Sequence, residues 1–138
     1  AMESEPNNID ATFAICNTYS KKRYYTDAIG YCEKALKLSP EESDIMNRLA
    51  WLYAKKGRNI DLGVKLIQKT LKVYPNRSDY IDTLSELYYA QGDIVEAVKE
   101  IRKAINLKPD HAYYKQQLWK FKNVAPQSML TKLKQAGS

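Results

Sequence analysis

Three segments of similar shape decide how this sequence folds: KALKLSP at 34–40, KTLKVYP at 69–75 and KAINLKP at 103–109. Each segment ends in a proline, and the prolines follow one another at intervals of 35 and 34 residues. A tyrosine inside an apolar cluster precedes each proline at a nearly constant distance, and the three are Tyr19, Tyr53 and Tyr88. A period of this length indicates an array of similar supersecondary units, each packed against its neighbours.

The spacing of apolar residues predicts two amphipathic helices in each unit. A bulky residue lies four positions before the tyrosine, as in Ile15–Tyr19 and Leu84–Tyr88, and residues with this spacing share one face of a helix. Small residues occupy aligned positions on the two helices, so we expect the two backbones to approach closely. They are Cys16, Ala50 and Ser85 on the first helices and Ala28, Gly63 and Ala97 on the second helices.

Glycine and proline mark the predicted helix ends. Gly57 and Gly92 fall between the two halves of their units, where a helix C-terminus favours a residue that tolerates a left-handed φ. Asp93 follows as a suitable N-cap for the next helix. The repeated proline then ends the second helix, because its ring removes a hydrogen-bond donor and clashes with the preceding turn.

These aligned positions resemble the tetratricopeptide repeat, whose signature of about 34 residues runs W-x2-L-G-x2-Y…A-x3-F…P. The third unit is most similar, the second carries one extra residue between its two helices, and none has the leading tryptophan. The resemblance implies an all-α fold in which antiparallel helix hairpins stack into a right-handed superhelix. The expected parts are a disordered segment at 1–8, repeats at 9–42, 43–77 and 78–111, a capping helix at 112–123 and a tail at 124–138 with a short helix at 127–136. The stretch 49–93 also resembles repeat pairs common in bacterial proteins.

The residues that carry most enzyme chemistry are sparse. His111 is the single histidine, and the two cysteines are not at metal-ligand spacing from it. The sequence contains no glycine-rich phosphate loop and no H-E-x-x-H motif. We therefore expect no enzymatic activity, no cofactor and no metal. No apolar run approaches the ~18 residues of a membrane span, and the compartment is not indicated.

Cys16 and Cys32 lie on the two helices of the first hairpin, both at core positions. The favoured interpretation is that they are small buried side chains. A disulfide between them is sterically conceivable but not required.

The resemblance implies that the first helix of each unit lines a concave face, where partner peptides lie. The candidate groove residues are Phe13, Asn17, Asn47, Arg48, Trp51, Lys55, Asp82, Thr83, Glu86, Tyr89, Tyr113 and Gln117. Four of these are aromatics without an evident core role, although Trp51 packing against a neighbouring helix is an equal alternative. Arg48 and Lys55 predict a basic centre, and the third unit predicts an acidic cluster of Asp79, Asp82 and Glu86. We expect a partner with a complementary charge pattern.

Some proteins with this repeat bind the C-terminal carboxylate of chaperones through a clamp of lysine, asparagine and arginine. Asn17 matches that clamp, but Phe13 stands where its first lysine lies and Arg48 where its second asparagine lies. Asp79 and Thr83 replace its last two cations, and an acidic residue there would repel a carboxylate. We therefore do not expect a chaperone tail as the ligand.

The leading hypothesis is a protein-interaction scaffold that binds a peptide or partner protein in the concave groove. Self-association is an alternative, because Trp119 and the tail at 127–136 would expose apolar surface. Nucleic-acid binding is less favoured. The net charge of +6 and the lysines after His111 support it, but the acidic cluster in the groove opposes it.

Overall fold

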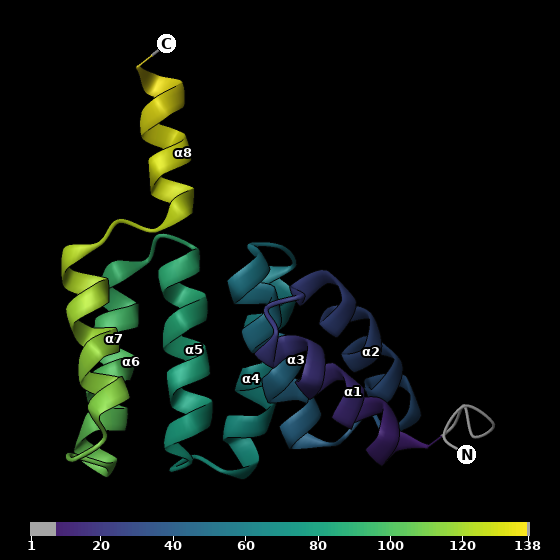
Figure 1. The fold of residues 1–138 in the computed structure, drawn as a ribbon. Helices are drawn as coiled ribbons and strands as arrows, with labels where there is room; N and C mark the ends of the chain where they lie inside the picture. Colours follow the sequence, from purple (N-terminus) through teal and green to yellow (C-terminus); the bar gives the residue numbers. More distant parts are fainter. Residues whose placement is uncertain (1–7, 138) are drawn as a thin grey trace.

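The computed structural model describes residues 8–137 of the chain, and within them it contains eight α-helices joined by short turns. The first six helices form three antiparallel hairpins: α1 (Ile9–Lys21) with α2 (Tyr25–Leu38), α3 (Ser43–Lys56) with α4 (Ile60–Val73), and α5 (Ser78–Ala90) with α6 (Ile94–Leu107). They are followed by α7 (Ala112–Asn123) and α8 (Gln127–Ala136). The hairpins stack side by side, α7 continues the stack beside α6, and α8 projects away from it (Figure 1). The predicted all-α hairpin stack is confirmed.

The first helix starts from a capping residue that the sequence analysis placed in a disordered segment. Asn8 is the N-cap of α1, and its Oδ1 atom accepts a hydrogen bond of 2.9 Å from the backbone N–H of Ala11. A side chain in this position satisfies one of the free N–H groups at the start of a helix. The expectation of disorder over 1–8 is therefore wrong at its last residue, and residues 1–7 lie outside the described part.

The small residues at the hairpin crossings are buried as predicted. Ala50 on α3 and Ala28 and Ala97 on the second helices are fully buried. A Cβ atom added to Gly63 would lie 2.8 Å from Cδ2 of Leu87 and 3.5 Å from the carbonyl oxygen of Ala50. A larger side chain at position 63 would therefore require the Leu87 side chain on α5 to shift, while α3 lies in ordinary van der Waals contact.

The turn inside each hairpin has the same backbone conformation. The residue four positions after the aligned tyrosine has a positive φ in every unit, 64° at Arg23, 74° at Gly57 and 86° at Gly92. Two of the three are glycines, which adopt this conformation without a steric penalty. The first hairpin uses an arginine instead. Asp93 is the N-cap residue of α6 as predicted, but its side chain makes no capping hydrogen bond.

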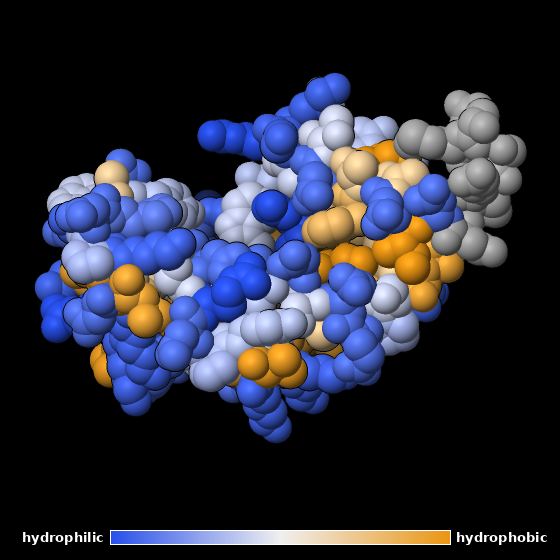
Figure 2. Space-filling view, turned by 90° about the horizontal axis from the view of Figure 1, so that it is seen from below, coloured by the Kyte–Doolittle hydropathy of each residue, from blue (hydrophilic) through white to orange (hydrophobic). Residues whose placement is uncertain are grey.

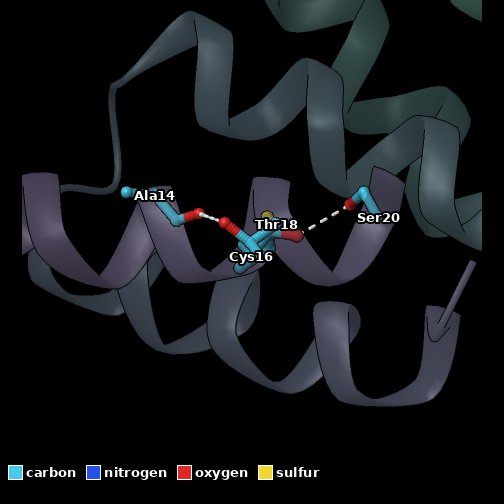
Figure 3. Close-up of a disulfide and its surroundings, with 5 residues drawn as sticks. Ala14, Cys16, Thr18 and Ser20 are labelled. Carbon is cyan, nitrogen blue, oxygen red and sulfur yellow. Dashed lines mark hydrogen bonds between the residues drawn. A yellow bond between two sulfur atoms is a disulfide. The ribbon is translucent and has the colours of Figure 1, made fainter. Parts of the chain in front are cut away.

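A disulfide joins the two helices of the first hairpin (Figure 3). Cys16 on α1 and Cys32 on α2 are both fully buried, and their Cα atoms are 5.5 Å apart, which is within the usual range for a bridge. Beside it, the hydroxyl groups of Thr18 and Ser20 donate to backbone carbonyls one turn earlier. The interpretation of the cysteines as unbridged core residues is therefore wrong, although both do lie in the core.

The capping helix closes the apolar core at the end of the stack. Tyr114 and Phe121 are buried against α5 and α6, whereas Trp119 on the other side of α7 is 62% exposed. An exposed outer face suits a terminal cap. The surface at the lower end of the stack is mostly hydrophilic, with separate hydrophobic patches (Figure 2). Among residues 8–137, no helix is both long and apolar enough to cross a membrane.

Candidate functional site

The candidate residues lie on the first helix of each hairpin and on the cap: α1 carries Phe13 and Asn17, α3 carries Asn47, Arg48, Trp51 and Lys55, α5 carries Asp82, Thr83, Glu86 and Tyr89, and α7 carries Tyr113 and Gln117. We call the surface formed by these four helices the groove. Three hollows lie along it, and the one beside Phe13 is lined by the carboxylates of Asp10, Glu42 and Asp44. The other two are described below, and they differ in the state of the polar groups that line them.

The first hollow, of about 380 Å³, lies between α1 and α3 and is called the Arg48 hollow. Its lining residues are Asn17, Ser20, Lys21, Arg48 and Trp51. The Oδ1 atom of Asn17 and the Nε atom of Arg48 are buried without a hydrogen-bond partner in the described part of the chain, and so is Oδ1 of the neighbouring Asn47. Buried polar groups are usually satisfied, because leaving one unpaired costs about 1–3 kcal/mol.

Arg48 has no carboxylate partner within residues 8–137. Burial lowers the pKa of its guanidinium below the ordinary value. The guanidinium carbon lies 5.3 Å from the centre of the Trp51 ring, and the Lys55 ammonium lies 5.4 Å from the same ring. Trp51 also packs edge-on against Tyr25 of α2, with ring centres 5.9 Å apart. Trp51 is therefore half-buried and fixed in place between two cations.

The second hollow, of about 610 Å³, is called the Lys120 hollow. It lies between the C-terminal end of α3, the middle of α5, α7 and the start of α8. Four of its lining residues are lysines: Lys55, Lys56, Lys120 and Lys132. Glu86 lies in its wall and is buried, and it accepts hydrogen bonds from Lys55 and from Lys120, the latter at 2.9 and 3.0 Å. Burial favours a raised pKa for Glu86, but the two ammonium groups outweigh it and hold that pKa below its usual value.

Asp82 is also buried, one turn before Glu86 on α5. Its Oδ1 atom accepts a hydrogen bond of 3.1 Å from the side-chain amide of Gln117 on the cap. Burial raises the pKa of Asp82 to about 6, and the hydrogen bond from Gln117 offsets only part of this rise. Asp82 and Glu86 therefore hold α7 against α5, and their charges do not face the solvent.

The predicted acidic third unit is therefore wrong as a description of the groove surface. Besides the two buried carboxylates, Asp79 is paired with Arg77, with contacts of 2.8 and 2.9 Å. Thr83 is buried, and its hydroxyl donates to the carbonyl oxygen of Asp79 at 3.2 Å. The side chains of Asp82 and Glu86 are bound by the capping helix, whereas Asp79 is exposed beside Arg77.

Three of the four candidate aromatics differ from the expectation that they lack a core role. Tyr89 stacks on Phe121 of the cap with ring centres 4.9 Å apart, and its hydroxyl donates to the carbonyl oxygen of Val124 at 2.8 Å. Phe13 is half-buried and packs against the first core cluster, as does Trp51. Tyr113 is 40% exposed and remains on the surface.

Two cations of the Lys120 hollow, Lys56 and Lys132, are not among the predicted site residues. Lys56 is the last residue of α3, and Lys132 lies on α8 beyond Pro126, where the repeat pattern has ended. Sequence spacing therefore gave no register that would bring Lys132 to the groove. Across residues 8–137, no group of three or more histidine, cysteine or acidic side chains is arranged to hold a metal ion.

Several solved structures share this arrangement of helices. An O-GlcNAc transferase from Thermobaculum terrenum superposes with a TM-score of 0.74 and 19% identity over 82% of this chain, which spans only 22% of the transferase. The first repeat domain of Spaghetti (RPAP3), bound to the HSP90 peptide SRMEEVD, gives 0.70 and 16% identity over 83% of this chain and 90% of that one. YrrB, a repeat protein with an unusual peptide-binding site, gives 0.70 and 18% identity over 79% of this chain and 56% of that one.

At these identities the structural likeness shows the fold alone. No curated protein matches the sequence. Profiles of the tetratricopeptide repeat match residues 12–42, 31–61 and 79–111, which together cover more than half of the chain. The matches at 12–42 and 79–111 coincide with the first and third hairpins, and the match at 31–61 runs from α2 through α3 to the start of α4. The chain therefore belongs to the tetratricopeptide repeat family.

Proposed function

We propose that the chain is a protein-interaction scaffold whose groove binds an extended segment of a partner protein. The observation that carries this proposal is the set of three buried polar atoms without partners, on Asn17, Asn47 and Arg48. They lie on the adjacent helices α1 and α3, and two of the three residues, Asn17 and Arg48, line the Arg48 hollow. Together they offer two acceptors and one donor, which a peptide backbone and side chain can satisfy.

The related structures support the same reading. The Spaghetti domain was solved with a bound peptide, and YrrB has a peptide-binding site. The similarity to the transferase covers 22% of that enzyme and carries no transferase activity to this chain.

The test is an affinity-capture experiment with two matched double variants. The groove variant combines Asn17→Ala with Arg48→Met. The control variant combines Lys99→Met with Asn106→Ala, which also removes one cation and one amide, from exposed positions on α6. We expect the wild-type chain and the control to retain the same specific partners, and the groove variant to lose them. Retention of every partner by the groove variant would show that the groove is not the binding surface.

Self-association is a second candidate, because apolar side chains are exposed at the C-terminal end of the stack. Trp119 is 62% exposed and Leu133 on α8 is 65% exposed. Surface of this kind often marks a contact between proteins. Sedimentation velocity over a range of concentrations tests it: a dimer that the Leu133→Lys variant abolishes supports this contact, and a monomer at all concentrations excludes it.

A further inference from the structure

The Arg48 hollow and the Lys120 hollow follow one another along α3, and we call their cationic lining the cationic path. Together they are lined by six cations, Lys21, Arg48, Lys55, Lys56, Lys120 and Lys132. Trp51 lines the Arg48 hollow, and its ring lies within 5.5 Å of both Arg48 and Lys55, so it connects the two hollows. Glu86 is the carboxylate that lines them, and Lys55 and Lys120 already bind it.

We propose that the occupant of the groove is an acidic peptide segment, bound through several of its Asp or Glu side chains and anchored by one of them on Arg48. This inference rests on the proposed peptide-binding function and adds the chemistry of the partner. The Arg48 and Lys120 hollows offer an excess of positive charge, and an acidic segment is the complement that steers encounter and fixes register at such a surface.

Arg48 is the anchor because its side chain is half-buried, its Nε atom is buried without a hydrogen-bond partner, and no carboxylate of the described residues pairs with its guanidinium. The other cations of the path differ from Arg48. Lys55 and Lys120 are both paired with Glu86. The side chains of Lys21, Lys56 and Lys132 are exposed to solvent. A guanidinium presents its donors as a planar fork that matches a carboxylate with two hydrogen bonds. A carboxylate from the partner would therefore satisfy the Nε atom and the charge at once.

The unpaired amides distinguish a peptide from a nucleic acid. The atoms without partners on Asn17 and Asn47 are carbonyl oxygens, which need an N–H or O–H donor. A peptide backbone supplies one N–H at each residue except proline, whereas the phosphate groups of a nucleic-acid backbone supply only acceptors. The positive charge alone would suit both polymers, but the acceptors favour the peptide.

The length of the path favours side-chain carboxylates over a single terminal carboxylate. The six cations come from α1, α3, α7 and α8, and they line two separate hollows. One C-terminal carboxylate can reach only one of these positions. A segment with several acidic residues along its length can engage Arg48 in one hollow and the lysines in the other.

The experiment selects peptides from a random phage-displayed library in which the C-terminus of each peptide is joined to the coat protein. Only side-chain carboxylates are then available for binding. An enriched peptide is synthesised as the C-terminal amide, and its dissociation constant is measured by fluorescence anisotropy with the wild-type chain, Arg48→Met and Lys99→Gln. A labelled oligothymidine is titrated in parallel with each protein.

We expect the enriched peptides to contain more Asp and Glu than Lys and Arg. Arg48→Met should weaken their binding at least about tenfold, because it removes one partner of a buried charge pair. Lys99→Gln removes the same charge from an exposed position and should change binding less than about twofold. Circular dichroism should show that Arg48→Met is folded, since the change removes a buried unpaired charge.

The other outcomes overturn the inference in distinguishable ways. Neutral or basic peptides that the double variant Asn17→Ala, Arg48→Met no longer binds would overturn the acidic ligand and leave the proposed groove function intact. Enriched peptides that bind all groove variants equally, or a library without enriched peptides, would count against the groove function as well. Oligothymidine that binds through Arg48 and displaces the peptides would assign the cationic path to nucleic acid.

Discussion

The two ends of the groove carry similar numbers of polar side chains but satisfy them differently. Between α1 and α3, Asn17, Asn47 and Arg48 keep buried atoms without partners. Between α5 and α7, Asp82 and Glu86 are bound by the side chains of Gln117, Lys55 and Lys120. The polar groups at the first end therefore remain available to another molecule, whereas the two carboxylates at the second end are used to attach the cap.

This difference shows that equivalent positions in a repeat array need not have equivalent roles. Each repeat contacts mainly its neighbours, so a groove-facing side chain in the last repeat meets the cap instead of a ligand. The two ends also differ in how they are held together, by a disulfide in the first hairpin and by ion pairs and hydrogen bonds at the cap. The following predictions test these contrasts, beginning with the largest expected effect.

Replacing Lys55 and Lys120 at the cap should lower the free energy of unfolding strongly. Replacing Arg48 should change that free energy little. The double variant Lys55→Met, Lys120→Met leaves the buried Glu86 without an opposite charge, so we expect a loss of about 3–5 kcal/mol in the free energy of unfolding. Arg48→Met removes a charge that has no partner and should change it by less than about 1 kcal/mol. Urea denaturation monitored by circular dichroism measures both, and equal losses would refute the contrast.

Reduction of the disulfide should weaken the first hairpin selectively. The bridge closes a loop with a sequence separation of 16 residues, for which the chain-entropy estimate of stabilisation is about 3 kcal/mol. Dithiothreitol should lower the free energy of unfolding by this amount and speed hydrogen exchange in α1 and α2 more than in α5 and α6. The double variant Cys16→Ala, Cys32→Ala serves as the control, because its stability should not respond to the reductant. If dithiothreitol leaves the free energy of unfolding of the wild-type chain unchanged as well, the disulfide does not stabilise the first hairpin.

The sequence predicted the regular parts of this comparison. The period of the tyrosines and prolines gave the hairpins, and the small residues at the crossings gave the close contact at Gly63. The burial of the polar side chains on the groove face could not be predicted from the repeat spacing. The register places Asp82 and Glu86 on the groove face, but their burial depends on the docking of α7, which local spacing does not encode. The disulfide was missed because a cysteine at a core position fits the packing equally well with or without a bridge.

The direction of α8 also could not be predicted from the repeat spacing. A short helix over 127–136 could be expected from composition, and the structure has α8 over Gln127–Ala136. Its direction depends on the turn around Pro126, however, and that turn brings Lys132 to the Lys120 hollow. The contribution of Lys132 to the cationic path therefore could be recognised only from the folded structure.

Acidification should stabilise the cap through Asp82. The pKa of Asp82 is raised from 3.8 to about 6 by burial, so the folded chain binds this proton more tightly than the unfolded chain does. The resulting stability is present at pH 4 and is lost as the pH rises to about 6. Between pH 7 and pH 5 we expect a gain of about 1–2 kcal/mol in the free energy of unfolding. The contribution of Glu86 has the opposite sign and is lost only below its ordinary value of 4.5.

Asp82→Asn is the control for this pH dependence, because the amide oxygen still accepts the hydrogen bond from Gln117 but does not titrate. Its stability should be flat between pH 5 and pH 7 relative to the wild-type chain, and higher at pH 7. Urea denaturation at pH 5, 6 and 7 checks both statements. A variant with the same pH profile as the wild-type chain would show that Asp82 is ionised without cost in the folded state.

The smallest expected effect concerns the turn of the first hairpin, where Arg23 takes the conformation that glycine takes in the other two. Its φ of 64° is disfavoured for a residue with a side chain, at a cost of about 1 kcal/mol. Arg23→Gly should therefore raise the free energy of unfolding by up to about 1 kcal/mol, although the added freedom of glycine in the unfolded chain offsets part of this gain. Gly57→Ala is the reverse experiment: the added Cβ would meet no atom within 4 Å, so its cost of about 1 kcal/mol reports the backbone conformation alone. If both substitutions destabilise the chain, the side chain of Arg23 contributes a contact that outweighs the strain of its backbone, and the first hairpin is better adapted to its arginine than the comparison with Gly57 and Gly92 implies.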